Sequence, residues 1–83
     1  MATVIIHTTP WCPYCVRAKQ LLDTKQVEYV EVNVSEADER TKMTSLTGGT
    51  TVPQIVINEQ PIGGCDELHA LERSGELDKL LVK

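Results

Sequence analysis

Two cysteines, Cys12 and Cys15, stand where an apolar run ends and a run of helix-forming residues begins. Residues 3–7 (TVIIH) are apolar and β-branched, which predicts a buried strand. Pro13 follows Cys12, and proline is favoured in the first turn of a helix, where its missing N–H costs nothing. The sequence therefore predicts a strand, a short loop and a helix that begins at the cysteine pair.

The rest of the chain continues to alternate between strands and helices. After the first helix we predict a strand at 27–34, followed by a helix that Ser35 caps and that Gly48 and Gly49 end. Two strands at 51–58 and 61–64 come next, joined by a tight turn at Glu59 and Gln60. The chain ends with a helix at 65–75 and a last helical turn at 76–81. A crossover helix makes the first two strands parallel, and the last two strands form a hairpin. The order β-α-β-α-β-β-α predicts an α/β fold with helices on both faces of one sheet.

Length and composition exclude several classes of protein. A chain of 83 residues is long enough for one domain, which we expect to span 1–83. A net charge of −4 argues against a nucleic-acid-binding protein, which needs a basic face. No apolar run is long enough to span a membrane, and residues 1–10 do not resemble a signal peptide. We therefore expect a cytoplasmic protein that binds neither membranes nor nucleic acid.

The cysteine pair is suited to thiol–disulfide exchange. At the N-cap of a helix, the sulfur of Cys12 faces unpaired N–H groups and the positive end of the helix dipole, which stabilise a thiolate. Cys15 lies about one turn later on the apolar side of the helix, so we expect a buried thiol with a higher pKa. An exposed nucleophile beside a buried resolving thiol is the asymmetry that this exchange requires.

Other uses of the cysteines have less support. A structural zinc site takes four ligands, and no second Cys-x-x-Cys motif is present to complete one, so we predict no metal site. A structural disulfide between Cys12 and Cys15 would close a very short loop and constrain little chain entropy. Cys65 makes the number of cysteines odd, which excludes a fully paired disulfide framework.

Three motifs in a fixed order are more specific than the cysteine pair alone: WCPYC at 11–15, TTVPQI at 50–55 and IGGCDEL at 62–68. With these motifs, residues 3–82 closely resemble a glutaredoxin of the dithiol Cys-Pro-Tyr-Cys class and of the small bacterial type. The resemblance implies a thioredoxin-like fold, with a four-stranded mixed sheet flanked by helices. It also implies a monomeric enzyme that uses glutathione as co-substrate and holds no tightly bound cofactor.

The resemblance also implies a role for individual residues. Cys12 would attack a protein disulfide or a protein–glutathione mixed disulfide, and Cys15 would resolve the intermediate. The residues implied to bind glutathione are Tyr14, Thr51, Val52, Pro53, Gly64, Cys65 and Asp66. Tyr14 would flank the binding groove, although a surface aromatic that only shields Cys15 is a simpler interpretation.

Two of the motifs suggest how glutathione would be held. In the family the Val52–Pro53 bond is cis, which would leave the Val52 backbone free to pair with the cysteine part of glutathione. The N–H groups of Cys65 and Asp66 open a helix and would bind the γ-glutamyl carboxylate, while Asp66 would accept a hydrogen bond from the ammonium group. Judged from the residues alone, Pro53 is an ordinary strand-initiating proline and Asp66 a plain helix cap.

The chain departs from the family's pattern at two places. Many relatives carry a lysine three residues before the first cysteine, where this chain has Thr9. Relatives often have arginine or glutamine just before the Thr-Val-Pro motif to hold the glycine carboxylate, where this chain has Gly49 and Thr50. Arg40 matches a basic position of the family, although a solvated helix arginine is the simpler interpretation. These departures imply weaker affinity for glutathione without loss of function.

The remaining reactive side chains have simpler roles. A helix start would favour the thiolate of Cys65 and its glutathionylation, but a small residue that contributes only its backbone N–H is the simpler interpretation. We expect His7 at a strand end and His69 on a helix surface, neither of them placed to act as a base. Trp11 lies in the loop that borders the cysteines.

Two rival functions share part of these motifs. Some members of the wider family dimerise around a [2Fe–2S] cluster with glutathione, but they tend to have glycine or serine where this chain has Pro13. A dithiol electron donor dedicated to ribonucleotide reductase would share Cys-x-x-Cys but would lack the GGCDEL segment. We therefore predict a glutathione-dependent oxidoreductase that acts on disulfide-containing or glutathionylated proteins. Ribonucleotide reductase is one candidate among its substrates.

Overall fold

The computed structural model describes residues 3–81; residues 1–2 and 82–83 of the expected domain lie outside the described residues. In chain order the elements are β1 (Val4–Thr8), α1 (Pro13–Thr24), β2 (Val30–Asn33), α2 (Ala37–Thr47), β3 (Gln54–Ile57), β4 (Gln60–Gly63), α3 (Cys65–Ser74) and α4 (Glu76–Leu81). The predicted order of elements is confirmed, and the last helical turn forms the separate helix α4.

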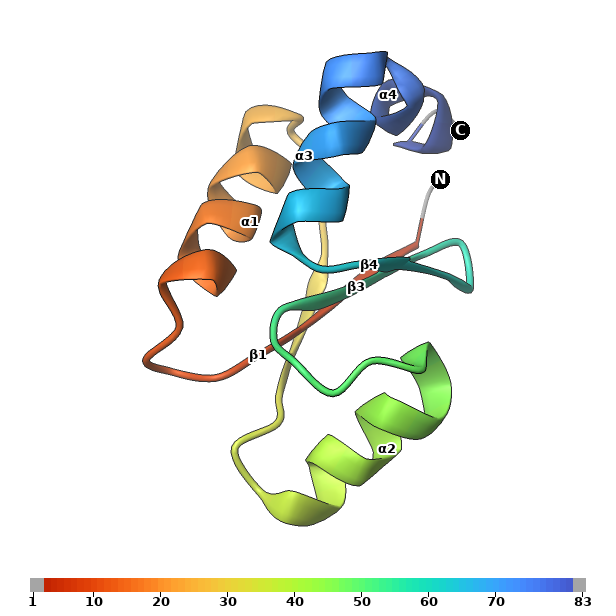
Figure 1. Ribbon diagram of the computed structural model, residues 1–83. Coiled ribbons are helices and arrows are strands. Elements are labelled where there is room, and N and C mark those ends of the chain that lie inside the picture. The colour runs from red at the N-terminus through yellow and green to blue at the C-terminus, as the bar shows by residue number, and fades with distance from the viewer. Residues whose placement is uncertain (1–2, 82–83) are drawn as a thin grey trace.

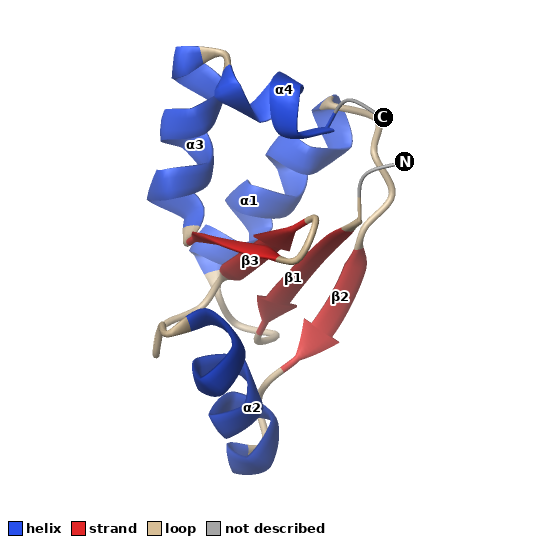
Figure 2. Cartoon of the chain, turned by 90° about the vertical axis from the view of Figure 1, so that its right-hand side faces the viewer, coloured by secondary structure: helices blue, strands red, loops and turns tan. Residues whose placement is uncertain are grey.

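The four strands form one mixed sheet in the order β2-β1-β3-β4. β1 and β2 are parallel, whereas β3 is antiparallel to both β1 and β4. Figures 1 and 2 show α1, α3 and α4 on one side of the sheet and α2 on the other. The structure therefore confirms a thioredoxin-like α/β fold with helices on both faces.

The core lies between the sheet and the layer of α1, α3 and α4. Ile6 and Ile55 are paired across β1 and β3, and neither side chain is exposed to solvent. Leu22 of α1, Leu68 of α3 and Leu77 of α4 are buried against them in the same cluster. Because α1 and α3 both pack on this core, the segments that open the two helices lie near each other, next to the start of β3 (Figure 1).

The second strand is shorter than predicted. The sequence pattern suggested a strand at 27–34, but β2 runs only from Val30 to Asn33, because β1 is its single neighbour and pairs with it only over Ile5–Thr8. The predicted cap at Ser35 is also wrong. The side chain of Asn33 accepts a hydrogen bond from the Ser35 N–H at 2.8 Å, and Glu36 becomes the N-cap of α2 without a side-chain hydrogen bond.

The predicted hairpin forms, with different bounds. β3 begins at Gln54 rather than at 51, because the segment that contains Pro53 forms a loop. The turn comprises Asn58 and Glu59, one residue earlier than predicted, and both have positive φ, of 52° and 67°. Within residues 3–81, no helix has the length and apolar character needed to cross a membrane.

Candidate active site

The cysteine pair opens α1 as predicted. Cys12 is the N-cap, with an extended backbone (φ −110°, ψ 106°), and Pro13 is the first residue of the helix. The Cys12 sulfur accepts a hydrogen bond from the Cys15 N–H at 3.1 Å, so one of the free donors of the first turn is directed at it. The Cys12 thiol in turn lies 3.7 Å from the carbonyl oxygen of Val52, to which it donates.

The two thiols differ in environment, as expected. Cys15 is 1% exposed, whereas Cys12 is partly accessible. Burial is the largest of the effects that raise the pKa of Cys15 to about 12, and the hydrogen bond with Cys12 is the next. Cys15 is therefore a protonated thiol at neutral pH, and Cys12 is the sulfur of the pair that a substrate can reach.

The loop before β3 carries a cis peptide bond between Val52 and Pro53, as the resemblance implied. His7 anchors this loop, because its Nδ1 donates to the carbonyl oxygen of Gln54 at 3.0 Å. His7 is predicted at a strand end; it lies inside β1 and is 5% exposed. Gly49 lies against this loop, since a Cβ at this position would meet the end of the Gln54 side chain.

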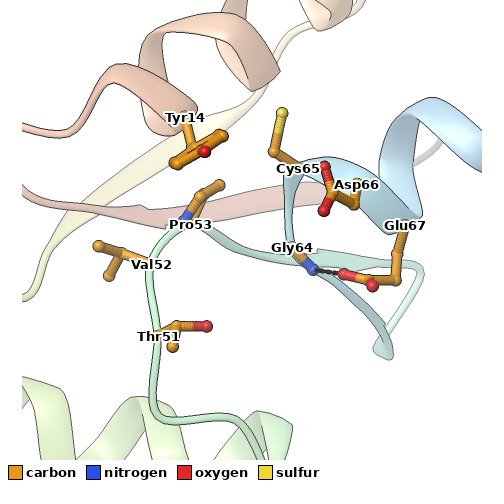
Figure 3. A pocket seen from close by; sticks show the side chains of 8 residues that line it. All are labelled: Tyr14, Thr51, Val52, Pro53, Gly64, Cys65, Asp66 and Glu67. Carbon is orange, nitrogen blue, oxygen red and sulfur yellow. Dashed lines mark hydrogen bonds between the residues drawn. The ribbon is translucent and has the colours of Figure 1, made fainter.

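A cavity of about 500 Å³ lies between this loop, the start of α1 and the start of α3. It is lined by Tyr14, Thr51, Val52, Pro53, Gly64, Cys65, Asp66 and Glu67 (Figure 3). The structure thus brings together all seven residues that the resemblance assigns to glutathione. Cys12 is not among the lining residues, but its contact with Val52 puts the nucleophile at the border of the cavity.

Glu67 is the lining residue that the sequence reasoning missed. Its carboxylate accepts a hydrogen bond from the Gly64 N–H at 2.7 Å, the dashed line in Figure 3. A glutamate three residues after the N-cap is the usual signal for such a contact, and it was available in the sequence. The cavity therefore combines N–H groups of the first turn of α3 with two carboxylates, those of Asp66 and Glu67.

Cys65 is not an activated thiol. A helix start would favour its thiolate, but the side chain is 6% exposed, and burial raises the pKa of the Cys65 thiol, which counts against the alternative of a reactive cysteine. His69 is half-buried rather than on the open helix surface. Its Nδ1 donates to the carbonyl oxygen of Cys65 at 2.9 Å and lies 3.4 Å from the Cys65 sulfur.

The residues around the cysteines are accessible. Trp11 is 93% exposed, and Tyr14 is 55% exposed with the Arg17 guanidinium carbon 5.9 Å from its ring centroid. Arg40 is not simply solvated, which corrects the simpler interpretation: its Nε donates to the carbonyl oxygen of Thr50 at 3.3 Å. Within residues 3–81, no three histidine, cysteine or carboxylate side chains are grouped closely enough to hold a metal ion.

A Cys-x-x-Cys pair at a helix N-terminus, next to a cis-proline loop of a thioredoxin-like sheet, defines a protein built for thiol–disulfide exchange. Comparison with known proteins agrees, since the glutaredoxin family profile matches residues 4–62. A glutaredoxin of Pseudomonas aeruginosa is 55% identical over 82 residues, covering 98% of each chain.

Solved structures lead to the same family. The solution structure of a glutaredoxin from Brucella melitensis has a TM-score of 0.86 and 49% identity, covering 98% of this chain and 89% of that one. The crystal structure of a buckwheat glutaredoxin–glutathione complex has a TM-score of 0.85 and 30% identity, covering 94% of this chain and 74% of that one. The chain belongs to the glutaredoxin family, and it is accordingly a thiol–disulfide oxidoreductase.

Proposed function

We propose that the protein is a glutathione-dependent oxidoreductase that reduces protein disulfides and protein–glutathione mixed disulfides. The observation that carries the proposal is the cavity of about 500 Å³ next to Cys12. A volume of this size is typical of sites for small ligands, and it suits a tripeptide. Its chemistry also suits glutathione, which carries carboxylates, one ammonium group and a thiol.

The lining residues suggest the orientation of the ligand. The γ-glutamyl carboxylate would bind the N–H groups of Cys65 and Asp66 in the first turn of α3. The ammonium group would lie near the carboxylate of Asp66. The cysteine part would pair with the Val52 backbone, which brings its sulfur toward Cys12. A structural relative, the buckwheat glutaredoxin, is described in complex with glutathione, which supports this assignment.

The reaction follows from the two thiols. The Cys12 thiolate attacks a mixed disulfide, its sulfur becomes glutathionylated, and the protein substrate leaves as a thiol. In the monothiol route, a second glutathione attacks this mixed disulfide and releases Cys12 together with oxidised glutathione. In the dithiol route, Cys15 attacks instead and closes a Cys12–Cys15 disulfide, which two glutathiones then reduce. Glutathione is co-substrate throughout, and no tightly bound cofactor is needed.

The cellular setting belongs to the same proposal. We infer a single domain that acts as a monomer in the cytoplasm on disulfide-containing or glutathionylated proteins, ribonucleotide reductase being one candidate. Glutathione reductase with NADPH would complete the electron chain. The [2Fe–2S] alternative predicts visible absorbance in protein purified without oxygen, and a colourless protein would count against it.

The proposal is tested with the Cys15→Ser variant and a glutathionylated peptide, with glutathione as the only reductant. We expect this variant to remove glutathione from the peptide, because Cys12 and the cavity suffice for the monothiol route. Cys12→Ser is the matched control and should be inactive. If Cys15→Ser is inactive while the unaltered protein still reduces dithiol substrates, the protein is a dithiol electron donor and glutathione dependence is wrong.

A further inference from the structure

A charged cluster lies outside the cavity and has no part in the proposed reaction so far. The Lys19 ammonium of α1 lies 3.0 Å from Oε2 of Glu31 on β2. The same carboxylate oxygen accepts a hydrogen bond from the Thr8 hydroxyl of β1 at 2.7 Å. Thr8 is 2% exposed, and the Lys19 side chain is 29% exposed. The cluster therefore joins three elements through the carboxylate of Glu31.

The geometry of α1 places this lysine one turn after the resolving cysteine. Lys19 follows Cys15 by four residues, so the two side chains lie on the same face of the helix. Helical side chains are tilted toward the N-terminus, so the stem of Lys19 lies on the Cys15 side of its turn, while its ammonium group reaches Glu31. Glu31 pairs with Ile6, whose side chain is in the core under α1, which puts its carboxylate on this side of the sheet.

The charged and titratable groups around Cys15 and Lys19 come from several elements. Cys15 interacts with Cys12, which raises its pKa, while the Thr9 backbone and the Lys19 charge lower it. Lys19 itself interacts with Glu31, with Tyr29 and with Cys15, and each of these interactions raises the pKa of Lys19. From α3, the thiol of Cys65 interacts with Arg17 and with Cys12. Among these side chains, Lys19 is the cation that acts on Cys15.

A cation near Cys15 would favour the thiolate that the dithiol route requires. The buried thiol of Cys15 must lose its proton before it can attack, and burial opposes the negative charge. We propose that Lys19, held by Glu31 and Thr8, is a positioning residue that stabilises the Cys15 thiolate during the resolving step. The inference rests on the proposed function, since it concerns the dithiol route of the same reaction.

The step is balanced without a further reactant. The Cys15 proton passes to solvent, and the thiolate attacks the Cys12 sulfur of the Cys12–glutathione disulfide. The Cys12–Cys15 bond forms as the bond to glutathione breaks, and the electron pair leaves on the glutathione sulfur, which takes up a proton. Lys19 stays protonated throughout and contributes only its charge.

The test measures how fast iodoacetamide alkylates Cys15, as a function of pH, in a Cys12→Ser/Cys65→Ser background. Lys19→Gln should lower the thiolate fraction at pH 8 about two- to threefold, because the Lys19 charge is the last and smallest of the influences on the pKa of Cys15. Because thiolates of higher pKa are stronger nucleophiles, the alkylation rate should fall by a smaller factor, about 1.5-fold. Lys19→Arg keeps the charge and should restore the original profile.

Lys42→Gln is the matched control. It removes the same charge from α2, where Lys42 contacts Glu39 at 3.2 Å. Figure 1 shows α2 across the sheet from α1. The pH profile of this variant should equal that of the background. If Lys19→Gln also leaves the profile unchanged, or if Lys19→Arg fails to restore it, the proposal is overturned.

A second measurement separates this inference from the proposed function. Lys19→Gln should slow the reduction of dithiol substrates, yet it should leave peptide deglutathionylation unchanged when added to Cys15→Ser. The alkylation profile uses no glutathione, so a protein that fails to use glutathione can still support or overturn the role of Lys19. Equal slowing of both activities would mean a general structural effect and would contradict the inference.

Discussion

Thr9 stands where the resemblance to the family implies a lysine. It lies in the loop before Cys12, close to the start of α1. Thr9→Lys would add a cation near the thiolate and the anionic tripeptide. We expect the Michaelis constant for glutathione to fall about two- to fivefold, as for a charge near a helix terminus. Ser45→Lys, an exposed site on α2, is the control, and an unchanged constant in Thr9→Lys contradicts the prediction.

Gly63 is the residue at which both backbone and space require glycine. Its φ is +117°, and a Cβ there would lie 2.8 Å from Cγ of Glu67. Gly63→Ala should lower the free energy of unfolding by about 1–3 kcal/mol and displace Glu67 from the Gly64 N–H. Gly48 has φ +78° and open space around it, so Gly48→Ala should lower the free energy of unfolding only through the strained backbone. Urea unfolding measures both, and equal losses would contradict the role given to Glu67.

At the scale of elements, Glu31 links β2 to β1 and α1. The hydrogen bond from Thr8 is the largest of the effects that lower the pKa of the Glu31 carboxyl, and the hydrogen bond from Lys19 is the next. The ionised form therefore stabilises the fold at neutral pH, and this contribution is lost as the pH falls below the ordinary value of 4.5. Glu31→Gln should lower the free energy of unfolding at pH 7 by less than about 1 kcal/mol, because water screens this side chain. Urea unfolding at pH 7 and pH 3 tests it; a difference that persists at pH 3 excludes ionisation as the cause.

The turn between β3 and β4 has a residue that its geometry does not favour. Asn58 and Glu59 both have positive φ, and glycine is preferred at the second position of such a turn. Glu59→Gly should raise the free energy of unfolding by about 1 kcal/mol.

Asn58→Gly is the contrasting variant for this turn. The Asn58 side chain accepts from the Thr3 N–H at 3.0 Å and donates to the Leu80 carbonyl at 3.1 Å. The substitution removes both contacts and should not stabilise the protein. If Glu59→Gly leaves the midpoint of urea unfolding unchanged, the cost assigned to its backbone is wrong.

At the scale of the whole molecule, α4 closes the core. A helix of six residues is too short to be stable alone, so its packing must hold it in place. Leu77 is fully buried among residues of β1, β3 and α3, and Lys25 joins α1 to Glu72 of α3 at 2.6 Å and to Asp78 of α4 at 2.9 Å. α4 is therefore part of the single core and should unfold with it.

Leu77→Ala tests this prediction. The free energy of unfolding should fall by about 2–5 kcal/mol, a large share of the stability of a small domain. Leu80→Ala, at a partly buried position of the same helix, should cost clearly less. Urea unfolding followed by circular dichroism measures both. A loss of helical signal in Leu77→Ala before the main transition would mean that α4 unfolds separately.

Local patterns determined much of this protein. Proline after Cys12 begins α1, and Gly48 and Gly75 end α2 and α3 with positive φ. Such signals act through neighbours in the chain, so they can be predicted from the sequence. The order of elements, the cysteine asymmetry and seven of the eight residues around the cavity followed from these signals and from the motifs of the family.

The tertiary structure decided what depends on partners distant in the chain. β2 is short because of the single strand beside it, and burial raises the pKa of Cys65 against the effect of its helix start. The contact between Lys19 and Glu31 likewise required α1 to be packed on the sheet. Local preferences act over a few residues, whereas burial and long-range contacts exist only once the elements are packed together.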